Sequence, residues 1–126
     1  SKEDVEKLGI CAGDFLAVEP RFQVTEKGYI KSRFLDDKAS SGVLLGIAKY
    51  VSEHPGCLKR NVQLFFTTFE EIGHGASAGI PEEIEDLLAV DMGCVGDHLA
   101  CTEKQVSICA KDSSGAYHFE MTNELN

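Results

Sequence analysis

The amino-acid sequence predicts an α/β fold, and three features indicate it. Residues 62–69 form an almost continuous apolar and aromatic run, typical of a strand buried on both faces, and residues 87–90 and 105–110 repeat this pattern. Apolar side chains recur at helical spacing over residues 39–51. Residues 14–34 are β-prone and are divided by proline and glycine. Buried strands that alternate with a helix favour a sheet covered by helices.

The first part of the chain, residues 1–35, differs in texture from the rest. Residues 14–19 and 21–25 are short β-prone stretches separated by Pro20, and residues 29–34 follow the turn Glu26-Lys27-Gly28. This pattern predicts a β-hairpin region without a helix. Such a region is too small to be a stable domain by itself.

The second part, residues 36–126, has α/β texture. Its first helix is expected to stop at His54-Pro55-Gly56, because the residue before a proline disfavours helical backbone. A second helix is expected to begin within residues 117–125. Because neither end of the chain coincides with a completed element, we expect an internal piece of a longer protein. A loop is marked by Gly73, Gly75 and Gly79.

The charge balance excludes one class of partner. The chain has 21 acidic and 12 basic residues, and its net charge is −9. No cluster of lysine or arginine interrupts this excess, so the chain repels a phosphate backbone, and nucleic acid is not an expected partner. We expect acidic runs such as residues 82–86 to form a solvated surface.

The sequence also predicts a cytoplasmic location without membrane contact. The longest apolar run, residues 42–48, is far shorter than the ~18 residues that a membrane span needs. No N-terminal stretch has the pattern of an export signal. The five cysteines form no CxxC pair, so we expect free thiols in a reducing compartment, packed as small buried hydrophobic side chains.

Carboxylates stand at three places where the predicted elements begin or end. Asp36-Asp37 precedes the first helix, Glu70-Glu71 follows one apolar strand, and Asp91 follows the next. The carboxyl ends of strands form the ligand crevice of open α/β sheets. Converging carboxylates repel one another unless a cation holds them, so a divalent metal is one reading. The alternative is that such residues only cap helices, as Asp37 does in this reading.

Three motifs carry a family resemblance. The strings KSRFLDDKASSG, FFTTFEEIGHGAS and LLAVDMG resemble, in order and spacing, the metal-binding motifs of the glutamyl and tetrahedral aminopeptidases, metallopeptidase family forty-two. The later stretch DHLACTEKQVSICAKDSSGAYHFEMTNEL also resembles that family, so the similarity covers essentially the whole chain. It implies a partial three-layer zinc-exopeptidase core with a mixed sheet at residues 36–126. Residues 1–35 are then a β-rich remnant of the inserted dimerisation or lid domain.

The resemblance implies a role for each motif residue. Asp36 bridges two metal ions, and the peptide bond after it is cis in related enzymes. Glu71 ligates one metal, Asp91 ligates the other, and Glu70 is the general base. Two divalent ions are implied, zinc first, with cobalt or manganese as alternatives. They activate a shared water that cleaves the N-terminal residue from peptide substrates without a covalent intermediate. The family also implies a homo-oligomeric parent protein.

The chain departs from the family pattern in its histidines. The family needs one histidine ligand upstream of the inserted domain and another near the C-terminus. We expect His54 on the surface, His74 in a loop beside the site, and His98 and His118 in polar loops. With three of five ligands present, the isolated piece is expected to bind metal weakly and to be inactive.

The sequence leaves three other functions as alternatives. A non-catalytic interaction module would keep the acidic strand ends as structural features only. A related dimetal amidohydrolase would act on acylated amino acids, and only substrate profiling separates it from an aminopeptidase. A glucanase is disfavoured because sugar grooves are normally lined by tryptophan, and this chain has none.

Overall fold

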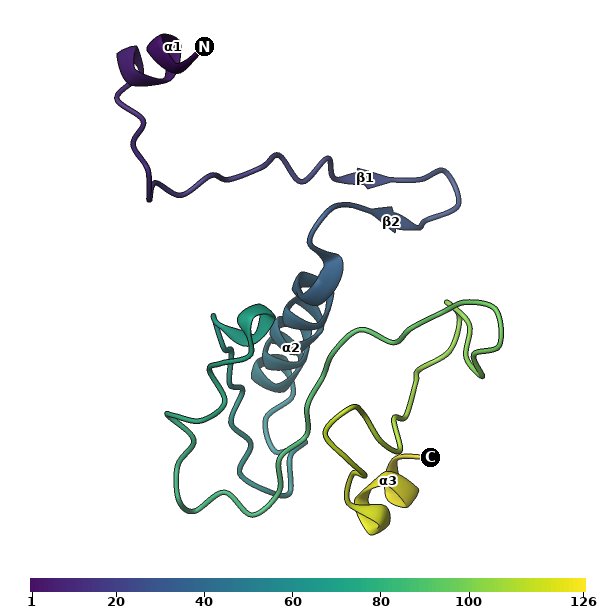
Figure 1. Ribbon diagram of the computed structural model, residues 1–126. Helices are drawn as coiled ribbons and strands as arrows, with labels where there is room; N and C mark the ends of the chain where they lie inside the picture. The colour runs from purple at the N-terminus through teal and green to yellow at the C-terminus, as the bar shows by residue number, and fades with distance from the viewer. The chain divides into compact units, whose positions relative to one another are not determined.

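The computed structural model describes residues 1–126 and divides into two compact units, Ser1–Leu35 and Asp36–Asn126 (Figure 1). The division falls between the same two residues as the expected domain boundary. The assignment of the units to an inserted domain and a catalytic domain stays a prediction. Each unit is described by itself.

The first unit begins with a helix that was not expected. Helix α1 spans Lys2–Lys7, so the prediction of a region without a helix is wrong. A capping box starts the helix: the Ser1 hydroxyl accepts from the Asp4 N–H, and the Asp4 carboxylate accepts from the Ser1 amine at 3.0 Å. Lys2 and Glu6 form an i,i+4 ion pair at 3.7 Å on the exposed face. These local contacts favour one turn and a half of helix where the residue pattern is not periodic.

The expected hairpin is confirmed. Strand β1 (Gln23–Val24) pairs antiparallel with β2 (Ile30–Lys31). The turn between them is closed by the Thr25 N–H, which donates to the Tyr29 carbonyl at 2.8 Å. Gly28 lies at φ +82°, the backbone region that the turn requires and that glycine adopts freely. The strands are shorter than expected, and residues 14–19 form none.

The second unit opens on the long helix α2, Leu35–Glu53. Asp36 and Asp37 have non-helical backbone angles, so the regular helix begins after them. The expected stop is confirmed, because the helix ends at Glu53 and Gly56 follows at φ +83°. At this end the ring of His54 stacks on Tyr50 with centroids 4.0 Å apart, on the surface as expected.

Two further helical segments follow. The 3₁₀ turn η1 covers Glu70–Ile72, and helix α3 covers Phe119–Leu125, which confirms the helix expected within residues 117–125. His118 caps α3, and its Nδ1 accepts from the Met121 N–H at 3.4 Å. The glycine-marked loop is also confirmed, since Gly73, Gly75 and Gly79 all have positive φ.

The three expected strands of the second unit are not formed. Residues 62–69, 87–90 and 105–110 carry no strand, and their side chains are not buried. Leu87 is 61% exposed and Val106 is 86% exposed. A strand needs neighbours for its N–H and C=O groups and a second layer over its faces. This structure has neither paired neighbouring strands nor a covering layer at these residues. The apolar pattern of the sequence is therefore not accompanied by the sheet that it predicts.

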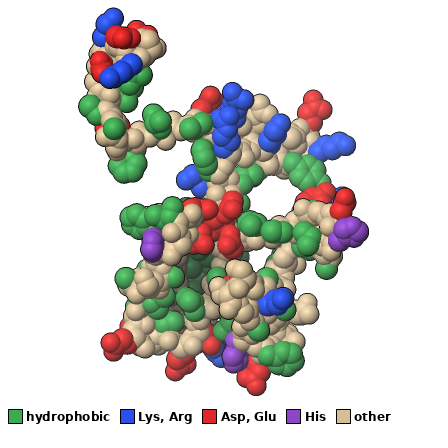
Figure 2. Space-filling model, in the orientation of Figure 1, with side chains coloured by type: hydrophobic (Ala, Val, Ile, Leu, Met, Phe, Trp, Pro, Cys, Tyr) green, Lys and Arg blue, Asp and Glu red, His purple; other side chains and the backbone are tan.

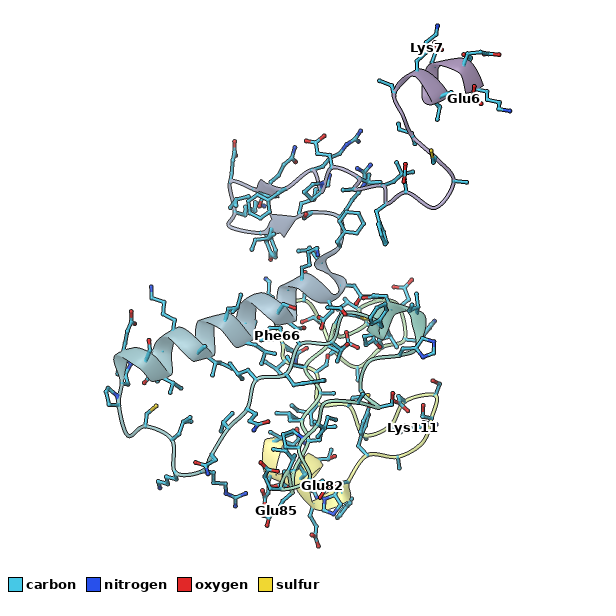
Figure 3. The ribbon with its side chains drawn as sticks, turned by 90° about the vertical axis from the view of Figure 1, so that its left-hand side faces the viewer. Glu6, Lys7, Phe66, Glu82, Glu85 and Lys111 are labelled. Carbon is cyan, nitrogen blue, oxygen red and sulfur yellow. The ribbon has the colours of Figure 1, made fainter.

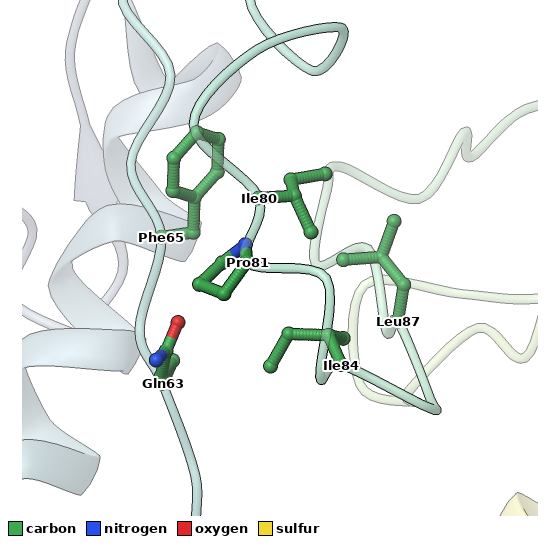
Figure 4. Close-up of a pocket in the computed structure, with 6 residues that line it drawn as sticks. All are labelled: Gln63, Phe65, Ile80, Pro81, Ile84 and Leu87. Carbon is green, nitrogen blue, oxygen red and sulfur yellow. The ribbon is translucent and has the colours of Figure 1, made fainter.

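Parts of these apolar segments nevertheless lie against one another. A Cβ at Gly93 would fall 2.6 Å from the Ser107 Oγ, and one at Gly79 would fall 3.3 Å from the Phe65 ring. Phe65 also lines a small hollow of about 30 Å³ with Ile80, Pro81, Ile84, Leu87 and Gln63 (Figure 4). That volume is about one water molecule. The residues after η1 therefore fold back on the apolar run of residues 62–69.

The unit has almost no interior. Ser40, on α2, is the one buried residue, with 7% of its surface exposed. All five cysteines are free, as expected, but Cys101 is half-buried and the others are exposed, so the expectation of buried thiols is wrong for the same reason as for the strands. The acidic run is solvated as expected, and Glu82 and Glu85 are exposed (Figure 3). No helix has both the length and the apolar character needed to cross a membrane.

Candidate metal centre

Three aspartate side chains meet in the second unit. Carboxylate oxygens of Asp36, Asp37 and Asp91 all lie within 4.8 Å of one another. Asp36 and Asp37 precede the regular turns of α2, and Asp91 directly follows the apolar residues 87–90. Figure 2 shows acidic side chains gathered at the middle of the view. Residues 55 positions apart in the sequence thus form one acidic cluster, although the strands that were expected to bring them together are not formed.

The backbone at the start of α2 sets the direction of the first two carboxylates. The peptide bond between Asp36 and Asp37 is cis, as the family resemblance implies. Asp37 has φ −116° and ψ 39°, outside the helical region, and its carbonyl accepts from the Ser41 hydroxyl at 3.2 Å. Asp37 does not cap the helix with its side chain. The reading of Asp37 as a simple helix cap is therefore wrong.

Glu71 joins the acidic cluster through Asp36. The pKa of the Glu71 carboxyl is raised above its ordinary value of 4.5, first by the charge of Asp36 and then by partial desolvation and a hydrogen bond with Asp36. The charges of Glu70 and Asp91 raise this pKa further. Asp36, Glu70, Glu71 and Asp91, the carboxylates to which the resemblance gives a role, therefore share one electrostatic environment.

The turn η1 separates the two adjacent glutamates. Gly73, in the left-handed region at φ +77°, donates its N–H to the Glu70 carbonyl at 2.8 Å and closes the turn. The His74 N–H donates to the Phe69 carbonyl at 2.9 Å. Glu71 interacts with Asp36, whereas Glu70 lines a separate hollow. Two neighbouring carboxylates are thus available for two different tasks.

The hollow beside Glu70 has a volume of about 290 Å³. It is lined by Glu70, Gly73, His74, Ala76 and Ser77, all from η1 and the loop that follows. His74 therefore lies in a loop beside the candidate site, as expected. It is not part of the group of side chains that could hold a metal, and neither are His54, His98 and His118.

The acidic cluster fits a divalent cation. The Asp37 Oδ1 is buried and has no hydrogen-bond partner, which is costly for a carboxylate among other carboxylates. The Asp91 Oδ1 accepts from the Met92 N–H at 2.6 Å, which holds that side chain in place. A cation would relieve the repulsion and give the unpartnered oxygen a positive neighbour. The donors of this chain are all oxygens, a set that suits hard and borderline divalent ions.

Sequence reasoning places Asp37 beside Asp36 among the converging carboxylates, with a helix cap as the alternative, and gives Asp37 no metal-binding role. The structure brings carboxylate oxygens of Asp36, Asp37 and Asp91 within 4.8 Å of one another. The signal for this is geometric, because the backbone angles at Asp36 and Asp37 are non-helical.

Comparisons with known proteins agree with these motifs. The family model described as M42 glutamyl aminopeptidase matches residues 1–126. The curated protein named "Putative aminopeptidase YhfE", from Bacillus subtilis (strain 168), is 44% identical over 124 residues, which cover 98% of this chain. This chain spans 36% of the length of that relative. No solved structure matches the chain.

Proposed function

Because the chain belongs to the M42 glutamyl aminopeptidase family, we propose that the whole protein is a metal-dependent aminopeptidase that removes residues from the free amino end of peptides. The observation that carries this proposal is the meeting of Asp36, Asp37 and Asp91 within 4.8 Å, with Glu71 beside Asp36. Such a group is the acidic half of a site for divalent ions. An interaction module has no need for a buried carboxylate oxygen without a partner.

In this proposal Asp36, Glu71 and Asp91 would hold the metal. The family is one of metallopeptidases, which use divalent metal ions. We propose two ions, zinc first, with cobalt or manganese as alternatives. When bound, such a pair lowers the pKa of a water and polarises the scissile carbonyl. No histidine of this chain joins the cluster, so further ligands come from outside residues 1–126 and the isolated chain is inactive.

The chain's own residues then divide the remaining work. The Glu70 carboxylate, which lies next to Glu71 and lines the hollow, takes a proton from the attacking water and passes it to the departing amine nitrogen. The surrounding negative charge attracts the protonated amino end of the peptide. This attraction accounts for cleavage from that end. No covalent bond between enzyme and substrate is needed.

The same proposal includes the architecture of the whole protein. The apolar residues 62–69, 87–90 and 105–110 become strands of a three-layer α/β core of the zinc-exopeptidase kind, and residues 1–35 belong to an inserted β-rich domain. The exposure of these apolar side chains supports a larger core, because they gain stability only when covered. The whole protein is proposed to be a cytoplasmic homo-oligomer, and the five free cysteines agree with a reducing compartment.

The test is peptidase activity of the whole protein. It is assayed with zinc or cobalt on a panel of aminoacyl chromogenic substrates and on N-acylated amino acids, beside Glu70→Gln and the exposed control Glu82→Gln. We expect metal-dependent release from free amino ends that falls by about 10²–10⁴-fold in Glu70→Gln and is unchanged in the control. Cleavage of acylated amino acids alone would favour an amidohydrolase. A protein inert on every substrate would refute both activities.

A further inference from the structure

The hollow beside Glu70 carries one inference about substrate choice. We propose that it binds a neutral hydrogen-bonding side chain, the carboxamide of glutamine or asparagine, from the residue next to the scissile bond, and that His74 selects this group. The inference rests on the proposed aminopeptidase function. It is supported by the volume of about 290 Å³, by the position of Glu70 in the wall, and by the chemistry of the remaining wall residues.

The loop that carries His74 is held in place on both sides. The His74 N–H donates to the Phe69 carbonyl at 2.9 Å, so the chain closes over η1. Next to it, Gly75 lies so near Thr67 that a Cβ would be 2.8 Å from the Thr67 Cβ. Only glycine fits there. The backbone of His74 and Gly75 is thus fixed against residues 67–69, and His74 lines the hollow together with Glu70.

The lining offers donors and one acceptor. His74 and Ser77 are the side chains of the wall that can donate hydrogen bonds. Glu70 offers carboxylate oxygens, and Gly73 and Ala76 leave room between the polar groups. A carboxamide both accepts through its oxygen and donates through its NH₂, so it satisfies both kinds of group.

Charge and solvation decide between the alternatives. A carboxylate side chain would meet the negative charge of Glu70 in the wall. An apolar side chain would remove water from His74 and Ser77 without giving them a partner. The neutral carboxamide avoids both costs, and a site built to hydrogen-bond discriminates against ligands that lack the matching group.

The test uses the whole metal-loaded protein and matched short peptides. Glutamine, glutamate and methionine, which have similar size, are placed in turn on each side of the scissile bond, and kcat/KM is measured. On one of the two sides we expect glutamine to be favoured over methionine and over glutamate by about 3- to 10-fold. His74→Ala should bring the glutamine-to-methionine ratio near one, His74→Asn should retain most of it, and the control His98→Asn should leave it unchanged.

The outcomes separate this inference from the proposed function. The inference is overturned if His74→Ala leaves the glutamine-to-methionine ratio of kcat/KM unchanged, or if the wild type prefers glutamate or methionine on both sides of the scissile bond. In either case, activity that depends on Glu70 would still support the proposed peptidase. A protein without peptidase activity overturns both. Should His74→Ala fail to fold, Ser77→Ala removes the other donor of the wall. That variant should lower the same ratio by about 2- to 4-fold, and an unchanged ratio would again contradict the inference.

Discussion

Asp36 is the group that most strongly raises the pKa of Glu71, by its charge and by a hydrogen bond between the two side chains. The residues come from different segments, the start of α2 and the turn η1. A cation bound between the two carboxylates would lower the raised pKa of Glu71 again. Metal binding should therefore favour loss of the proton from the Glu71 carboxyl.

The first prediction concerns this proton. Metal binding by the whole protein should release protons below neutral pH, because a cation favours the ionised form of Glu71. Without metal, the raised pKa stabilises the fold most below pH 4.5, and that contribution is lost as the pH rises through the raised value. Calorimetry in buffers of different ionisation enthalpy measures the protons released. Glu71→Gln should release fewer, and an equal number would contradict the assignment.

The second prediction concerns the unpartnered oxygen of Asp37. Asp37→Asn should stabilise the metal-free protein by about 1 kcal/mol, because it removes a negative charge and supplies an NH₂ donor to Asp36 or Asp91. It should also weaken metal binding by about 10- to 100-fold. Urea unfolding and metal titration give the two values. A variant that is destabilised without metal would show that Asp37 has a partner elsewhere.

The third prediction concerns the loop before α3. The Tyr117 hydroxyl donates to the Asp112 Oδ2 at 2.8 Å, which raises the pKa of Tyr117 and lowers that of Asp112. Stability from Asp112 is present above pH 3.8 and is lost as the pH falls through its lowered value. In an ultraviolet alkaline titration, one of the three tyrosines should ionise late, and Asp112→Asn should abolish the delay. A delay that persists would refute the bond.

The fourth prediction concerns the approach of Gly93 to Ser107. Gly93→Ala should destabilise the protein by about 1–3 kcal/mol, since the added Cβ would fall 2.6 Å from the Ser107 Oγ. Adding Ser107→Gly should restore most of the loss. Gly46→Ala, on α2 with nothing within 4 Å, is the control and should be neutral or stabilising. Chemical unfolding of the four proteins checks this, and a double variant no better than Gly93→Ala would contradict it.

Elements that depend on nearby residues were predictable from the sequence. The hairpin follows from the turn at Gly28, and the end of α2 follows from His54-Pro55-Gly56. Helix α1 was missed although its capping box, Ser1 to Asp4, is visible in the sequence. That box carries little weight without an apolar stripe behind it. Local backbone and capping contacts therefore account for both the successes and this miss.

Elements that depend on distant partners were not realised in this structure. Residues 62–69 have the composition of a buried strand, but pairing and burial require other segments, which composition cannot supply. The acidic cluster was predictable because Asp91, Glu70 and Glu71 directly follow apolar runs and Asp36 precedes a helix. The sequence could not decide between a metal-facing side chain and a helix cap for Asp37, because the direction of that side chain depends on backbone angles that no residue pattern encodes.

The exposed apolar run of residues 62–67 has a consequence for aggregation. Residues 62–67, Val-Gln-Leu-Phe-Phe-Thr, combine high β-propensity with no charge, no proline and no glycine, and Phe66 is 44% exposed. Segments of this kind stack into intermolecular cross-β zippers when their edges stay open. A preparation of residues 1–126 alone should therefore precipitate as fibrils that bind amyloid dyes. In a cell, a chaperone would bind this stretch of the nascent chain before the stretch pairs with other strands.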